Sequence, residues 1–313
     1  MKTSDGYFAF IHDGTQIFVQ ERGTGEPVLL IPGLGYASWS FARQVDELAK
    51  VARVLALDNR GAGRSGKPRG PYSIDQLADD AYTVLIQRAA LPAHIVGTSM
   101  GGYVALTLAL RHPEAVRSLT LIATTCGGPG SHGVPEETLQ AWTQASHLSA
   151  AGFAQATMPL SFAPGWTEEH PEEFDELLAG RLTAPTPPAA WLAQFAASAA
   201  FLTNGARPGT ITVPTVIIHG TQDRVVPYAN AEVLQKRIPD ASLVTLEGAG
   251  HLCWIERAPV VNAHLITMIA GGSGLDAGGP GHSRRDQQGQ TSGTSSAEST
   301  LQRTHHAPKG MWE

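Results

Sequence analysis

The chain has 313 residues, of which 42% are hydrophobic, so it is long enough for one large domain or two small ones with a sizeable core. Its formal net charge is −6 and no stripe or run of Lys and Arg appears, which argues against nucleic acids and anionic membranes as main partners. No apolar run reaches the roughly 18 residues that a membrane-spanning helix requires.

Targeting and redox signals predict a cytoplasmic protein. Met1–Phe10 contains Asp5 and no long apolar stretch, so we expect no signal peptide. Cys126 and Cys253 are too few for a disulfide framework or a zinc site. Free thiols in a reducing cytoplasm are the default expectation, and a single bridge between the two stays open as an alternative. We expect no metal and no cofactor.

The N-terminal segment predicts a β-hairpin. Tyr7–Ile11 and Gln16–Gln20 alternate apolar and polar residues on either side of Asp13-Gly14. This pattern is typical of two antiparallel strands joined by a two-residue turn.

From residue 28 to residue 124 buried strands alternate with helices. A capping-box pair, Ser73 and Gln76, opens one of these helices. The alternation predicts an α/β fold with a mostly parallel central sheet and helices on both faces. The predicted strands are Val28–Ile31, Val51–Leu57, Ala93–Val96 and Val116–Ala123, and the predicted helices include Ser38–Ala49 and Gly102–Leu110.

Residues 126–208 interrupt this alternation with helices and aromatic residues. We predict a helical cap over a substrate pocket, because pockets are mostly apolar and aromatic. A helical subdomain with its own small core is the alternative. The helices are predicted at Glu136–Leu148, Glu172–Leu182 and Ala189–Phe201, and the residues expected to bind substrate are Trp142, Met158, Phe162 and Trp191.

The α/β pattern resumes after the predicted cap. Residues 1–125 and 209–270 are therefore expected to form one core domain around it. Residues 271–313 are rich in Gly, Ser, Gln and Thr, and we expect a disordered tail because such a composition buries too little to fold. The later elements are strands at Thr215–His219 and Ser242–Leu246 and helices at Ala229–Ile238 and Pro259–Ile269.

Gly97-Thr98-Ser99-Met100-Gly101 is the motif that points to chemistry. It lies between an apolar run typical of a strand and one typical of a helix. In that context the pattern predicts a nucleophile elbow, a sharp turn that lifts the Ser99 hydroxyl out of the sheet. A plain glycine turn is the alternative, so partner residues decide between the two.

A serine hydroxyl needs a base, and the base needs a group that fixes its tautomer. Asp223 lies on the loop after the Thr215–His219 strand, and His251 follows the last strand, so both come after Ser99 at the same edge of the sheet. We predict His251 as the base and Asp223 as its orienting acid. The alternatives are a turn-forming aspartate and a surface histidine. His219 is a weak candidate for support of the acid.

Acyl transfer also requires two N–H groups that face the developing oxyanion. The backbone amide of Met100, directly after the nucleophile, is one candidate. The amide of Leu34, in the glycine-rich turn after the Val28–Ile31 strand, is the other. Because the amides act, the side chains at these positions matter little.

Four motifs follow one another along the chain: Pro32-Gly33-Leu34-Gly35, the segment Asp58–Ser65, Gly97–Gly102 and Gly248–His251. Together they resemble the α/β-hydrolase superfamily across roughly residues 16–270. Within it the chain is similar to the small esterases and lactonases grouped with 3-oxoadipate enol-lactonase, although meta-cleavage-product hydrolases and cofactor-free haloperoxidases share the elbow. Many relatives have His-Gly, with the histidine supporting the oxyanion loop, where this chain has Pro32-Gly33. The resemblance implies structural roles for Asp58 and Arg60 in the second motif.

The resemblance implies acyl transfer, because Ser99 stands where haloalkane dehalogenases and epoxide hydrolases of this fold have Asp. We therefore expect a soluble carboxylic-ester hydrolase that cleaves an ester or lactone of a small molecule through an acyl-enzyme. The alternatives are a C–C bond hydrolase, an acyltransferase or a cofactor-free oxygenase of the same fold. A ligand sensor that keeps the three residues but turns over slowly is a further alternative.

Overall fold

The computed structural model describes residues 6–271 and has an eight-stranded sheet at its centre, in the order β1-β2-β4-β3-β5-β6-β7-β8. β1 and β2 pair antiparallel with each other, as do β2 and β4, and all other neighbours are parallel. The expected α/β class with a mostly parallel sheet is thus confirmed. The strands are Gly6–Phe10, Gln16–Arg22, Pro27–Ile31, Arg53–Leu57, Ala93–Thr98, Val116–Ile122, Thr215–Gly220 and Ser242–Leu246.

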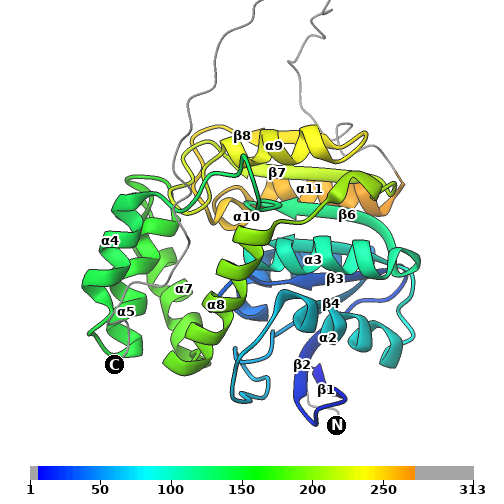
Figure 1. Ribbon diagram of the computed structural model, residues 1–313, viewed down its shortest axis with the longest axis horizontal. Coiled ribbons are helices and arrows are strands. Elements are labelled where there is room, and N and C mark those ends of the chain that lie inside the picture. The colour runs from blue at the N-terminus through cyan, green and yellow to red at the C-terminus, as the bar shows by residue number, and fades with distance from the viewer. Residues whose placement is uncertain (1–5, 272–313) are drawn as a thin grey trace, which may run out of the picture.

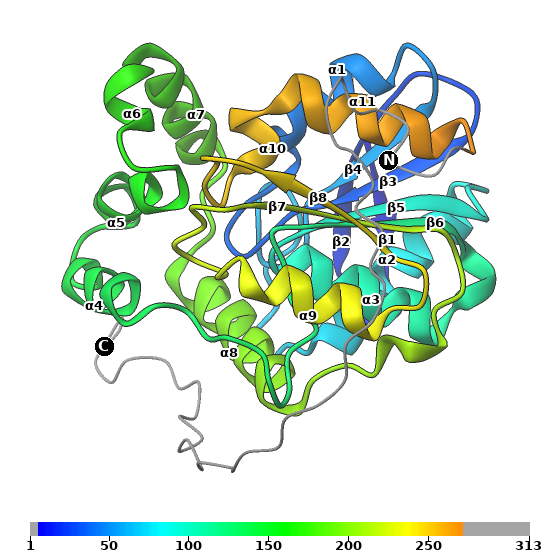
Figure 2. The ribbon, with the colours of Figure 1, turned by 90° about the horizontal axis from the view of Figure 1, so that it is seen from above.

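Helices cover both faces of the sheet (Figures 1 and 2). α1 (Ala42–Leu48) and α11 (Ala258–Ile269) lie on one face, and their apolar residues share a core with that side of the strands. α2 (Ile74–Gln87), α3 (Met100–Arg111) and α9 (Ala229–Arg237) contribute to the core on the other face. β5 and β7 are buried along their whole length because both of their faces are covered.

The N-terminal hairpin forms, but the predicted two-residue turn is wrong. The Ile11 N–H donates to the Thr15 carbonyl at 2.9 Å, which leaves a three-residue loop. The Asp13 carboxylate accepts from the Thr15 N–H at 2.9 Å, and Gly14 has φ +81°. A type I turn followed by a left-handed glycine is a common way to close a three-residue hairpin.

Ser73 caps the N-terminus of α2, as predicted. The Ser73 hydroxyl accepts a hydrogen bond from the Gln76 N–H at 3.0 Å, so one of the free amides of the first turn gains a partner. The helix that follows buries Leu77, Ala81 and Val84 on one side, in agreement with the predicted spacing.

We call residues 126–208, between β6 and β7, the helical insertion; no strand lies within it. α5 was not predicted; its N-terminus is capped by Ser149, which accepts from the Gly152 N–H. The helices of the insertion gather beside one end of the sheet, and α8 runs between them and α3 (Figures 1 and 2). They are α4 (Glu136–Ala145), α5 (Ala150–Thr157), the short α6 (Trp166–Glu169), α7 (Pro171–Thr183) and α8 (Pro188–Asn204).

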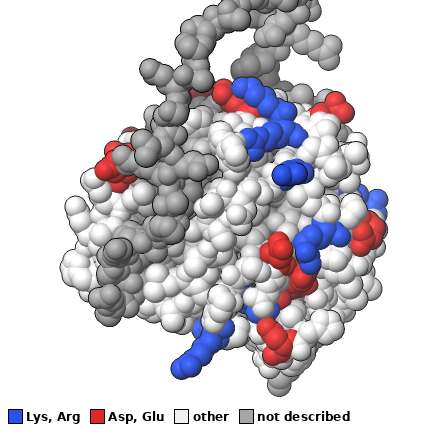
Figure 3. Space-filling view, in the orientation of Figure 1, with Lys and Arg blue, Asp and Glu red and all other residues white. Residues whose placement is uncertain are grey.

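Several expectations concern the surface and the chain ends. The face in Figure 3 carries scattered charges of both signs and no continuous basic patch. Among residues 6–271 no helix has the length and apolar character to cross a membrane. Cys126 and Cys253 are both buried and free, so the alternative of a bridge does not hold. The predicted tail lies outside the described residues from position 272 onward.

Candidate active site

Ser99 occupies a strained position between β5 and α3. Its φ and ψ are 53° and −121°, a region that residues with a side chain rarely adopt. The surrounding backbone holds it there, because the Ser99 N–H donates to the Ile122 carbonyl at 3.0 Å and the Thr124 hydroxyl donates to the Ser99 carbonyl at 2.7 Å. The turn therefore presents the Ser99 side chain at the carboxyl end of the central strand.

The glycines of the motif are required by close backbone contacts. A Cβ on Gly97 would collide with the carbonyl of Gly101, and one on Gly101 would collide with the carbonyl of Ile31. A Cβ on Gly102 would meet the Thr124 side chain. The plain glycine turn considered above does not explain why all three positions are this crowded.

The acid and the base predicted from the sequence lie together. Asp223 is fully buried in the turn after β7, and one of its oxygens accepts from the His251 Nδ1–H at 2.8 Å. The other oxygen accepts from the N–H groups of Val225 and Val226, both at 2.8 Å. These contacts fix the carboxylate, and Nδ1 of His251 carries the proton because its partner is an ionised acid.

The electrostatics keep Asp223 charged. Burial acts to raise the pKa of this carboxyl, but attraction to His251 and hydrogen bonds from His219 and His251 outweigh it. The pKa therefore lies well below its usual range. A permanent negative charge at this position favours the His251 tautomer whose Nε2 is free to accept a proton.

His219, only a weak candidate from the sequence, contacts the same carboxylate. Its Nε2 lies 3.0 Å from Asp223 Oδ2 and 2.8 Å from the Val226 carbonyl. Both neighbours are acceptors, so Nε2 carries the proton. Its Nδ1 is buried and has no partner within the described chain. His219 thus adds a further donor to Asp223.

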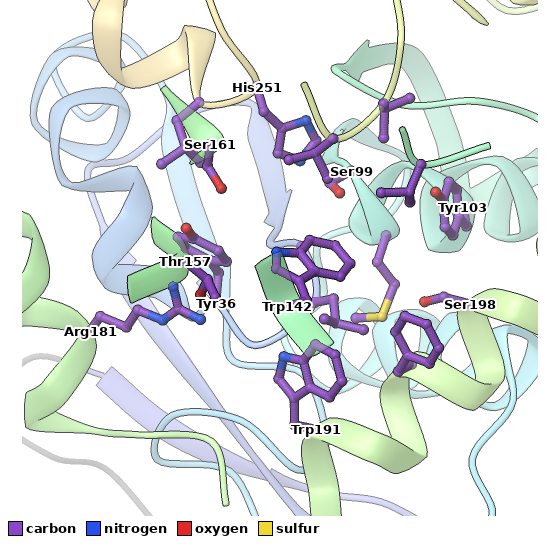
Figure 4. Close-up of a pocket in the computed structure, with 18 of the residues that line it drawn as sticks. Tyr36, Ser99, Tyr103, Trp142, Thr157, Ser161, Arg181, Trp191, Ser198 and His251 are labelled. Atoms are coloured by element: carbon purple, nitrogen blue, oxygen red, sulfur yellow. The ribbon is translucent and has the colours of Figure 1, made fainter. Parts of the chain in front are cut away.

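Ser99 and His251 line the same cavity. Figure 4 shows the His251 ring pointing toward Ser99 at one end of it. Within residues 6–271 the Ser99 hydroxyl does not form a hydrogen bond with the imidazole. Hydrogen bonds of this kind often become short and well aligned only in the complex with substrate.

Leu34 and Met100, whose amides are predicted to hold an oxyanion, both line this cavity. The loop after β3 runs so close to the nucleophile that a Cβ on Gly33 would lie 3.1 Å from Cβ of Ser99. In the part of the chain that the structure describes, neither the Leu34 nor the Met100 N–H has an acceptor. Both donors are therefore free for a ligand oxygen.

The cavity has a volume of about 100 Å³ and is mainly apolar. Trp142 and Trp191 line it, as expected from the sequence. Met158 and Phe162 do not: both are fully buried in the core, and the Phe162 ring stacks on Trp166 at 4.2 Å. Other aromatic residues that line the cavity are Tyr36, Tyr103, Phe153, Phe195 and Trp254.

Arg181 is the charged residue of the cavity that the sequence did not reveal. It comes from α7, and Figure 4 shows its guanidinium directed into the cavity. The guanidinium lies over the Tyr36 ring at 4.9 Å, and it forms no ion pair or hydrogen bond with any described residue. No carboxylate lines the cavity. Nothing in the local sequence distinguishes this arginine from one on an exposed helix face.

Comparison with known proteins identifies the family. Residues 26–258 match the model for the alpha/beta hydrolase fold. This protein belongs to the α/β-hydrolase family. The chain is 30% identical to 3-oxoadipate enol-lactonase 2 of Acinetobacter baylyi, covering 69% of this chain and 78% of the relative. It is 28% identical to 2-hydroxymuconate semialdehyde hydrolase of a Pseudomonas species, covering 78% and 87%.

Solved structures agree with this assignment. The enol-lactonase from Burkholderia xenovorans superposes with a TM-score of 0.73 at 27% identity, covering 84% of this α/β-hydrolase and 100% of that chain. The resemblance to lactonases of this fold, expected from the four sequence motifs, is therefore confirmed.

Proposed function

We propose that this α/β-hydrolase is a carboxylic-ester hydrolase that cleaves an ester or lactone of a small molecule through an acyl-enzyme. The observation that carries the proposal is the Asp223–His251 hydrogen bond at 2.8 Å, beside a serine on a strained turn in the same cavity. This combination supplies a nucleophile, a base and a group that orients the base.

In the proposed first half-reaction, Ser99 Oγ forms a bond to the carbonyl carbon while its proton moves to His251 Nε2. The amides of Leu34 and Met100 donate to the oxygen that becomes negative. The bond to the leaving alkoxide then breaks, and His251 returns the proton to that oxygen. A lactone keeps the released alcohol attached to the acyl group.

In the proposed second half-reaction, water attacks the acyl carbon and gives its proton to His251. The bond between the acyl group and Ser99 Oγ breaks, and the proton returns to Ser99. Asp223 stays ionised throughout, because its pKa lies well below the usual range, and it stabilises the imidazolium in both halves.

The cavity supports a substrate with an anionic group. Arginine binds carboxylates through paired, charge-assisted hydrogen bonds, so an arginine without an ion pair at the edge of an apolar cavity favours an anionic ligand. Arg181 is such a cation, and the buried hydroxyl of Tyr36 beside it has no partner in the described residues.

We further propose that residues 126–208 act as a cap on the core formed by residues 1–125 and 209–270.

C–C bond cleavage is the second candidate, favoured by the similarity to 2-hydroxymuconate semialdehyde hydrolase. An acyltransferase or a slow ligand sensor would use the same three residues. A panel of short esters, lactones and vinylogous diketones, assayed in the presence of water and of added alcohols, separates these activities by product.

The test is Ser99→Ala with short p-nitrophenyl esters as probes. We expect hydrolysis by the wild-type protein, none above background by the variant, and covalent labelling by a fluorophosphonate only in the wild type. Ser149→Ala changes an exposed serine that caps α5 and should keep full activity. Wild-type turnover retained by Ser99→Ala would overturn the proposal, and labelling without turnover would favour the sensor.

A further inference from the structure

The loop that carries Leu34 is held by a buried side chain on each side. Before Leu34, the Asn59 side-chain amide donates to the Pro32 carbonyl at 2.9 Å. After it, the Gly35 N–H donates to the Gln194 side-chain oxygen at 3.0 Å. These two contacts fix the peptide groups that flank the Leu34 amide.

Gln194 comes from α8 of the helical insertion and has no exposed surface. Its Nε2 donates to the Arg60 carbonyl at 2.8 Å, while its oxygen accepts from Gly35. Since one end must donate and the other must accept, only one orientation of this amide satisfies both neighbours. The side chain therefore joins two loops that are separated by 25 positions in the sequence.

The backbone at Gly35 packs directly against α8. Gly35 has φ +71°, and a Cβ on it would lie 2.9 Å from the Trp191 ring, one turn before Gln194 on α8. The helix thus reaches the turn through two neighbouring side chains. Pro32, at the start of the loop, has no polar side-chain atom that could support the loop from within.

We propose that Gln194 is a positioning residue that orients the Leu34 amide toward the oxyanion. The inference rests on the proposed function and deepens it, because it assigns part of the geometry of the reacting site to the helical insertion. Losing one oxyanion donor outright typically costs about 10²–10³ in rate, so a displaced donor should cost less.

The test uses Gln194→Met, which keeps the length of the side chain and removes both hydrogen bonds. The probe is butylboronic acid, which forms a tetrahedral adduct with a serine hydroxyl and places a boron-bound oxygen where the oxyanion would form. We expect the variant to bind the boronate about 10–100-fold more weakly and to lose kcat by a similar factor, with KM changed less than about threefold.

Two control variants separate positioning from folding. Gln44→Met removes another buried glutamine, one that donates to Trp254 and Asn262 between α1 and the C-terminal helices. It should lower the melting temperature but leave the ratio of boronate affinity to substrate KM unchanged. Gln140→Met makes the same change at an exposed position of α4 and should change neither quantity.

The outcomes distinguish this inference from the proposed function. Unchanged boronate affinity and kcat in Gln194→Met would overturn the positioning role, even if the enzyme hydrolyses esters. The positioning role would also be overturned if Gln44→Met lowered the ratio of boronate affinity to substrate KM by the same factor as Gln194→Met. A wild-type protein that neither binds the boronate nor hydrolyses esters would remove the proposed function and this inference together.

Discussion

At the scale of single residues, the Asp223 side chain is fixed by four hydrogen bonds. Its two oxygens accept from the ring nitrogens of His219 and His251 and from two backbone amides. A buried carboxylate is costly unless it is fully hydrogen-bonded, and here four donors surround it. The same contacts that keep it ionised also fix the His251 ring.

Asp223→Asn should reduce kcat/KM by about 10³-fold or more, because an amide can no longer select the His251 tautomer that accepts a proton at Nε2. Steady-state kinetics with p-nitrophenyl esters measures this loss. Asp175→Asn, on α7 and without a role in the proposed mechanism, is the control and should keep wild-type kinetics. A decrease of less than tenfold in Asp223→Asn would contradict the assigned role.

The lowered pKa of Asp223 also predicts how stability depends on pH. Because the folded-state pKa lies below the unfolded value of about 3.9, this carboxylate stabilises the fold above that pH and loses its contribution as pH falls further. Urea unfolding of the wild type and Asp223→Asn between about pH 2 and 6 should show a weaker acid dependence in the variant. Parallel curves would contradict this linkage.

Arg181 gives a prediction about substrate choice. Arg181→Gln should raise KM by about 10–100-fold for an ester that carries a carboxylate, because a charge-assisted contact in an apolar cavity is lost. The neutral methyl ester of the same compound should show nearly unchanged KM. An equal change for both compounds would argue against an anionic substrate.

At the scale of elements, a buried ion pair joins the loop after β4 to α2. Arg60 is 2% exposed and donates to both oxygens of Asp80 at 2.5 and 2.7 Å, and it also reaches Asp13 at 2.9 Å. The Arg60 carbonyl is the group to which Gln194 donates. The loop that the sequence motif identified as structural therefore connects the hairpin, α2 and the helical insertion.

Asp80→Asn should lower the free energy of unfolding by about 3–5 kcal/mol, since it leaves the buried Arg60 charge without its main partner. Chemical denaturation measures this change. The adjacent Asp79 pairs with Arg111 at 3.0 Å, but both side chains are more than 40% exposed. Asp79→Asn should therefore cost at most about 1 kcal/mol. Equal losses in both variants would contradict the argument from burial.

At the scale of the whole molecule, the helical insertion is tied to three of the loops that carry candidate catalytic groups, those of Leu34, Asp223 and His251. Gln194 binds the loop of Leu34. Arg224, next to Asp223, donates to the carbonyls of Pro159 and Phe162 in the insertion. Glu256 accepts from the Gly250 N–H, beside His251, and from the Ala163 N–H of the insertion. A shift of the insertion would move each of these loops.

The sequence alone was sufficient to predict the parts of the molecule that local pattern controls. Alternating apolar runs located the strands, Ser73 located the start of α2, and the elbow motif located Ser99 at a strand–helix junction. The chain order of Ser99, Asp223 and His251 placed them at one edge of a parallel sheet, because such strands all end on the same side. These signals extend over a few residues or follow from topology.

Only the tertiary structure decided which side chains surround the cavity. Trp142 and Trp191 face it, whereas Met158 and Phe162 turn into the core, although all four lie in the same apolar insertion. Neither Arg181 nor Gln194 is marked by the sequence around it. The hydrogen-bond partners of Gln194 lie 134 and 159 positions away in the sequence. Which face of a helix meets a distant loop depends on how the elements pack, and periodicity within one segment does not contain that information.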